Sequence, residues 1–265
     1  MKNSILAASI GTLMWVAMPL AAQTAPASEA KTPRTADGHP DLSGVWWRGA
    51  DVGGRPAPGS NPVATPARGG GPPPSFPGLY NAAAKAKAKT LSDKDDPSLG
   101  CVSTAFGTLG VSLFDVGAVA QIVQTPKFVI LLTETYHGFQ IVPTDGRPHR
   151  DSVPPSYRGD AIGHWEGDTL VVDKTNFTDT NWMSAEGRVS FHSDALHTVE
   201  RYHRVGNTLE IEATLYDPKV LTEPFVAPKQ TLVLAPFDQI MELSCSPGDT
   251  PELIDAAAKQ SSSKN

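Results

Sequence analysis

The sequence predicts an all-β fold, an antiparallel meander that closes into a barrel. Short apolar runs rich in β-branched residues recur about every ten residues from Val119 onward, with turn signals between them. Apolar residues almost nowhere recur at the helical spacing of i, i+3, i+4 and i+7, which argues against alternating strands and helices. Two long runs, 196–204 and 209–215, flank Gly206-Asn207, a two-residue turn typical of β-hairpins.

The chain begins with the three parts of a signal peptide: Lys2, an apolar run from Ile5 to Leu20, and small residues where a peptidase would cut. We therefore expect residues 1–22 to be removed and the protein to be periplasmic or secreted. The apolar run falls short of the roughly 20 residues that cross a bilayer, so we expect no stable membrane anchor. Residues 23–40 are rich in Ala, Thr and Pro and predict a flexible lead.

The expected barrel domain spans residues 41–248. It contains a long Gly/Pro-rich insertion at 49–77, which cannot form a regular helix or a central strand. A short helix is expected near residues 82–89, and Thr250 and Pro251 begin another within the C-terminal segment 249–265. Strands are expected at residues 120–123, 128–132, 139–142, 161–165, 169–172, 196–204, 209–215, 230–234 and 240–243.

Composition and missing motifs exclude some partners. The formal net charge of -6 makes a surface that repels phosphate backbones, so nucleic acid is not an expected partner. The chain has no Gly-x-Ser-x-Gly elbow, no Gly-x-Gly-x-x-Gly after a strand and no phosphate-binding loop. We therefore expect no cofactor and a small-molecule ligand or substrate; the oligomeric state is left open.

The sequence contains two cysteines, Cys101 and Cys245. Because an exported protein folds in a compartment that permits disulfides, we expect the two to pair. The bridge would join the segment before the first long strand to the end of the last. Two buried free thiols are the alternative.

The hairpin at Gly206-Asn207 determines which side chains share a face. Its register places Glu200, Tyr202 and Arg204 on the face of the aliphatic residues, and these three point inward if that face is the interior. His203 then lies outside, opposite Glu210. A slip of one residue would invert the assignment.

A second hairpin, at Gly167-Asp168, places His164 opposite Val171 and diagonal to Asp173. A general base needs such a carboxylate, which fixes the tautomer of the imidazole and stabilises the imidazolium. Surface His/Asp pairs also serve structure, and that alternative stays open.

Further polar residues concentrate in predicted loops, where sites are usually built on a rigid scaffold. The candidate catalytic residues are His149, His164, Asp173 and Glu200. The candidate substrate-binding residues are Tyr157, Arg158, Asp160, Tyr202 and Arg204. Ordinary turn chemistry explains part of this pattern equally well.

A divalent metal is a weaker alternative, with His192, Asp194 and His197 as ligands. Their spacing lacks the specificity of a Cys-x-x-Cys pair or a His-Glu-x-x-His helix, so we expect no metal.

Five phrases of the sequence resemble a family of exported, largely uncharacterised bacterial proteins with lipocalin-like character. The phrases are DLSGVW, QIVQTP, TDGRPH, GDAIGHWEGDTLVVD and HSDALHTVERYHRV. Within the first, Gly44-Val45-Trp46 is similar to the Gly-x-Trp that opens the first strand of lipocalins, where the Trp plugs one barrel end. The resemblance implies a lipocalin-like barrel, and it implies no particular reaction or active site.

Two functions follow as alternatives. The first is an exported enzyme, a lyase, isomerase or hydrolase, that uses His, Asp and Glu acid–base chemistry in a barrel pocket. The second is a non-catalytic, lipocalin-like carrier of an apolar small molecule. An enzyme should bring two or more titratable groups within reach of one point, whereas a carrier should show an apolar pocket.

Overall fold

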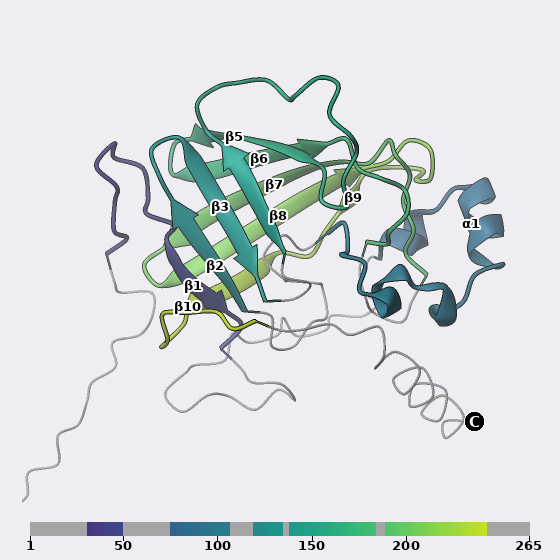
Figure 1. Cartoon of the computed structure of the whole chain (residues 1–265), viewed down its shortest axis with the longest axis horizontal. Coiled ribbons are helices and arrows are strands. Elements are labelled where there is room, and N and C mark those ends of the chain that lie inside the picture. Colours follow the sequence, from purple (N-terminus) through teal and green to yellow (C-terminus); the bar gives the residue numbers. More distant parts are fainter. Residues whose placement is uncertain (1–30, 50–74, 107–118, 135–137, 184–188, 243–265) are drawn as a thin grey trace, which may run out of the picture.

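The computed structural model describes residues 31–49, 75–106, 119–134, 138–183 and 189–242. Ten strands form one antiparallel sheet that rolls into a nearly closed barrel, with short helices at one end (Figure 1). The predicted all-β class is therefore confirmed. The strands are β1 (Gly44–Trp47), β2 (Val119–Gln124), β3 (Phe128–Thr133), β4 (Phe139–Pro143), β5 (Asp160–Glu166), β6 (Thr169–Thr175), β7 (His197–Val205), β8 (Thr208–Tyr216), β9 (Phe225–Val226) and β10 (Gln230–Leu234).

The two ends of the domain meet in the sheet. Strand β1 pairs with β2 on one side and with β10 on the other, and the sheet runs in the order β4-β3-β2-β1-β10-β8-β7-β6-β5, with β9 beside β8. Every ladder on this path is antiparallel, so the strand direction alternates from each strand to the next. The strands at the two ends of the path, β4 and β5, therefore run in the same direction. Parallel neighbours need a long connection, and residues 144–159 supply one.

The seam between β4 and β5 is held by packing and side-chain hydrogen bonds. Gly163 of β5 lies against β4 so closely that a Cβ there would stand 2.8 Å from Val142 Cγ1. Gln140 Nε2 donates to the backbone oxygens of Arg158, at 3.0 Å, and Gly159, at 3.3 Å. A larger residue at position 163 would force the seam apart.

The hairpin register read from the sequence is confirmed. Tyr202 pairs with Ile211 and Arg204 with Leu209 in the β7–β8 ladder, and the aliphatic face is the interior. Glu200 is 2% exposed and Tyr202 is 1% exposed, so almost no solvent reaches them. The inward side chains belong to the buried core of the barrel.

Trp46, the tryptophan of the Gly-x-Trp element, is a central member of the buried core of the barrel. Its ring is fully buried, and its indole N–H donates to the Leu42 carbonyl at 2.9 Å. The Arg204 guanidinium lies 5.0 Å from the ring centroid and donates from Nε to the Gly206 carbonyl at 2.8 Å. These contacts fix the orientation of the Trp46 ring inside the barrel.

A second apolar cluster lies where β7 begins and β8 ends, at the end of these strands opposite to Arg204. The 3₁₀ turn η1 (Phe76–Leu79) and helix α1 (Ala82–Ala88) contribute Phe76 and Ala84 to it. The side chain of Asn81 caps α1 by accepting from the Ala84 N–H at 2.9 Å. The predicted short helix is therefore confirmed, and Figure 1 shows it beside this end. No helix of the described residues is long and apolar enough to span a membrane.

The remaining short turns are η2 (Asp93–Asp95) and η3 (Pro97–Gly100). Within the expected flexible lead, Arg34 donates to Asp168 at 2.6 Å. The strand predicted at residues 240–243 is wrong for the described part, since 240–242 form no strand.

Several predicted segments lie outside the described residues. They are the signal peptide at 1–22, residues 23–30 of the lead, 50–74 of the insertion, Cys245, and the C-terminal segment 249–265.

Candidate functional site

Four side chains form a continuous run of hydrogen bonds, and we call them the His/Asp cluster: His149, Asp160, Asp173 and His197. His149 Nδ1 lies 3.1 Å from Asp160 Oδ2, and its Nε2 lies 2.9 Å from Asp173 Oδ1. His197 Nε2 lies 2.8 Å from the other oxygen of Asp173, Oδ2. One carboxylate therefore joins two imidazoles.

The strands explain why these side chains meet. Successive residues of a strand face opposite sides of the sheet, so Asp173 points outward between the inward Val172 and Lys174. Asp173 pairs with Val199 in the ladder between β6 and β7. His197 lies two residues before Val199, so the side chains of His197 and Asp173 share the outer face and are diagonal neighbours. His149 reaches the face from the 144–159 connection.

Hydrogen-bond roles follow from the carboxylates, which accept and cannot donate when ionised. His149 faces a carboxylate at each ring nitrogen, so its imidazolium form donates in both directions. His197 faces one carboxylate, at Nε2. The neutral ring of His197 then carries its proton on Nε2 and leaves a lone pair on Nδ1, for which no partner lies among the described residues.

The environment keeps both carboxyl groups of the cluster ionised. Burial alone would raise the pKa of Asp173, but hydrogen bonds from His197 and His149 outweigh it and hold that pKa below its usual value. Burial likewise opposes ionisation of Asp160, and hydrogen bonds from Arg150 and His149 lower its pKa. The Arg150 Nε donates to Asp160 Oδ1 at 2.6 Å.

This electrostatic arrangement predicts acid sensitivity. A carboxyl group whose pKa is lower in the folded state stabilises the fold above its unfolded pKa of about 3.9, and the contribution is lost as the pH falls through the folded pKa. Asp173→Asn should lower the free energy of unfolding at pH 7 by about 1–3 kcal/mol and flatten its decline below pH 4. Denaturant titrations at several pH values measure this, with the exposed Asp238→Asn as control. If the free energy of unfolding of Asp173→Asn declined below pH 4 as steeply as that of the wild type, the arrangement would be contradicted.

His164 lies outside the cluster. It pairs with Val171 in the ladder, as predicted, but its side chain is 57% exposed and its Nε2 lies 3.1 Å from Glu166 Oε1. The diagonal partnership expected between His164 and Asp173 is replaced by the contacts of Asp173 with His149 and His197. The sequence signal for His197 was its outward-facing position at the start of the long predicted strand 196–204.

Glu200, the remaining catalytic candidate, belongs to a buried network inside the barrel. It forms an ion pair with Lys174, which is fully buried, and accepts a hydrogen bond of 2.5 Å from the Tyr202 hydroxyl. Burial lowers the pKa of Lys174, and the charge of Glu200 opposes that shift. Sequence reasoning missed Lys174 because the predicted strand ended at Val172, although the two share the inward face.

The structure does not bring the five substrate-binding candidates together. Asp160 belongs to the His/Asp cluster, whereas Tyr202 and Arg204 lie inside the barrel. Arg158 donates from Nε to Ser103 Oγ at 2.9 Å, and burial lowers its pKa to about 10, against the charge of Glu200. Tyr157 is 41% exposed at the surface.

The three metal-ligand candidates take separate partners. His192 is buried, with Nδ1 2.9 Å from the Ser193 carbonyl and Nε2 3.1 Å from Asn181 Oδ1. Asp194 forms an ion pair with Lys219, and His197 bonds to Asp173. Across the described ranges, no group of three or more His, Cys, Asp or Glu side chains is arranged to hold a metal ion.

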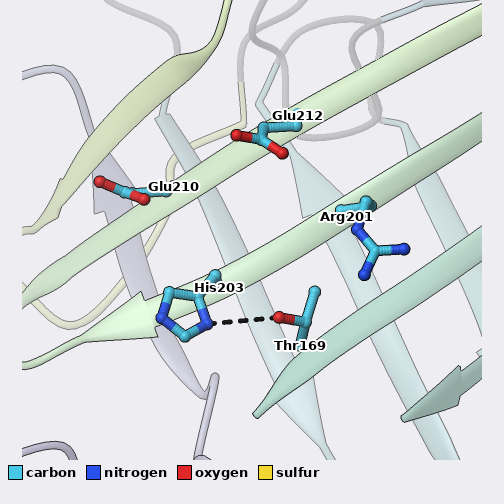
Figure 2. A pocket seen from close by; sticks show the side chains of 5 residues that line it. All are labelled: Thr169, Arg201, His203, Glu210 and Glu212. Carbon is cyan, nitrogen blue, oxygen red and sulfur yellow. Dashed lines mark hydrogen bonds between the residues drawn. The ribbon is translucent and has the colours of Figure 1, made fainter. Parts of the chain in front are cut away.

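A polar groove on the outer face of β6, β7 and β8 was not anticipated. It encloses about 250 Å³ and is lined by Thr169, Arg201, His203, Glu210 and Glu212 (Figure 2). The register of the β7–β8 hairpin places Arg201, His203, Glu210 and Glu212 on one face. The sequence therefore contained the signal for a polar surface at this place.

Comparison with known proteins adds no assignment. No family model, curated protein or solved structure matches this chain. The resemblance to an exported bacterial family therefore stays a prediction.

Proposed function

We propose that the protein is an exported enzyme that acts on a small organic molecule by acid–base chemistry, with His197 as the base. The observation that carries the proposal is the hydrogen bond between His197 Nε2 and Asp173 Oδ2 at 2.8 Å. A carboxylate in this position fixes the tautomer of the imidazole and stabilises its protonated form. His197 is therefore prepared to accept a proton at Nδ1.

The neighbours of His197 support this role. Its ring stacks on Tyr216 with centroids 5.3 Å apart, which restricts its orientation. Asp173 cannot rotate freely, because its second oxygen accepts from His149. His149 and Asp160 act as positioning residues, since they reach the base only through Asp173. The side chain of His197 is 37% exposed, so a substrate can approach it.

In hydrolysis, His197 would take a proton from water as the water attacks the substrate, and the imidazolium would give that proton to the leaving group as its bond breaks. Lyase and isomerase chemistry would use the same base on a C–H group. Interior packing argues against the alternative of an apolar carrier. The inward side chains Lys174, Glu200 and Tyr202 are at most 2% exposed, and they place charged and polar groups where an apolar ligand would have to bind.

The proposal predicts a loss of activity in His197→Gln. The amide of Gln can still donate to Asp173, but it cannot take up a proton, so the substitution removes the base and retains the hydrogen bond. We expect hydrolysis of p-nitrophenyl acetate, used as a probe because it responds to an activated imidazole, to fall about 10²-fold. The initial rate of p-nitrophenol release measures this, with circular dichroism to confirm folding.

Two further histidine variants make the test specific. His39→Gln changes a ring that stacks on Trp165, away from the cluster, and should keep the wild-type rate. His164→Gln removes the other candidate base. The proposal fails if His197→Gln hydrolyses the probe as fast as His39→Gln, or if the rate is lost in His164→Gln instead.

Export and the disulfide belong to the same proposal. The signal-peptide pattern of residues 1–22 supports a periplasmic or secreted protein, and such a compartment favours a bridge between Cys101 and Cys245. Thiol titration of the denatured, unreduced mature protein should find no free thiol. Two titratable thiols would contradict the bridge.

A further inference from the structure

The polar groove lies outside the acid–base machinery and has a composition of its own. Thr169 comes from β6, Arg201 and His203 from β7, and Glu210 and Glu212 from β8 (Figure 2). The ladder places Arg201 opposite Glu212 and His203 opposite Glu210. Hydrogen-bond donors therefore line one strand and carboxylate acceptors the next, about 5 Å apart.

Two charged side chains of the groove form ion pairs with residues beside it. Arg201 Nη2 donates to Glu166 at 2.6 Å, and Lys229 Nζ lies 2.5 Å from Glu210 Oε2. Glu212 is more open: its side chain is 60% exposed, and Lys229 Nζ lies 3.9 Å from its Oε1. The side chain of Glu212 is thus accessible to a ligand.

The alternation of charge selects the chemistry of that ligand. A cation in the groove would meet Arg201 and Lys229, and an anion would meet Glu210 and Glu212. A hydroxyl group donates to a carboxylate and accepts from a guanidinium at the same time. We propose that the groove binds a neutral polyhydroxylated molecule, a sugar or cyclic polyol, through neighbouring hydroxyl groups.

The size of the groove agrees with a single ring. Pockets for drug-sized ligands enclose about 300–1,000 Å³, and this groove encloses about 250 Å³. It also lies on the strand that carries the proposed base. Arg201 and His197 share the outer face of β7 four residues apart, or about 13 Å along the strand. A second ring of a longer polyol would extend toward His197, a link that rests on the proposed function.

Binding of cellobiose and myo-inositol by the full mature protein tests the inference. Isothermal titration should show binding of both probes by the wild type, and Glu212→Gln should weaken it at least tenfold, because Gln loses the charge-assisted hydrogen bonds. The exposed Glu223→Gln, outside the groove, should bind as the wild type does. Thermal unfolding confirms that the variants are folded.

Three results would overturn the inference: no binding of either probe, equal binding by Glu212→Gln, or binding of spermidine or citrate in place of the neutral probes. His197→Gln separates this inference from the proposed function. It should bind myo-inositol, which has a single ring, as the wild type does while losing hydrolysis of p-nitrophenyl acetate. If it keeps hydrolysis and myo-inositol still binds, the base assignment fails and the polyol groove stands.

Discussion

Lys174→Met is expected to lower the free energy of unfolding by about 3–5 kcal/mol. Lys174 is fully buried, and its ammonium group forms an ion pair with the buried Glu200. Removing the lysine leaves the Glu200 carboxylate buried without its ion-pair partner, and only the Tyr202 hydroxyl and the more distant charge of Arg158 then stabilise it. Denaturant unfolding at pH 7 measures the loss.

The chain offers a matched control for this prediction. Lys219 forms an ion pair with Asp194 at 2.6 Å, but its side chain is 59% exposed. Lys219→Met should therefore cost less than about 1 kcal/mol. Adding Glu200→Gln to Lys174→Met should recover part of the loss. Equal costs for the two Lys→Met variants would show that the buried pair does not stabilise the barrel as described.

Trp46→Ala is expected to lower the free energy of unfolding by about 3–5 kcal/mol, because it opens a cavity in the core of the barrel. The indole of Trp46 is fully buried, its N–H donates to Leu42, and its face contacts the Arg204 guanidinium. Truncation removes all three interactions. Thermal and denaturant unfolding of the variant measure the effect.

Trp165→Ala provides the comparison, since Trp165 is partly buried and stacks on His39 with centroids 4.5 Å apart. Its removal should cost clearly less than removal of Trp46. A loss in Trp46→Ala no larger than that in Trp165→Ala would contradict the central place of Trp46 in the core.

The fold and the hairpin registers could be predicted because they depend on local signals. Gly206-Asn207 and Gly167-Asp168 specify tight turns, and alternation along the strands then assigns Glu200 and Tyr202 to the interior. Local signals fail where pairing is absent. Residues 240–242 have a strand-like apolar pattern, yet they form no ladder, and the Met241 N–H donates to Glu134 instead.

The candidate site was predicted only in part, because it depends on contacts between distant residues. Asp160 and His149 were candidates, but nothing in their spacing reveals that the 144–159 connection carries His149 to Asp173. His197 was considered only as a metal ligand. Its true partner became evident from the β6–β7 ladder, which the sequence does not specify.

The tautomer of His197 tests the central claim most directly. Long-range ¹H–¹⁵N NMR of the mature protein, at a pH where the ring is neutral, distinguishes a proton on Nε2 from a proton on Nδ1. The hydrogen bond to Asp173 predicts the proton on Nε2 in the wild type and a mixture of tautomers in Asp173→Asn. A proton on Nδ1 in the wild type, or the same tautomer in both proteins, would contradict the assignment of His197 as the base.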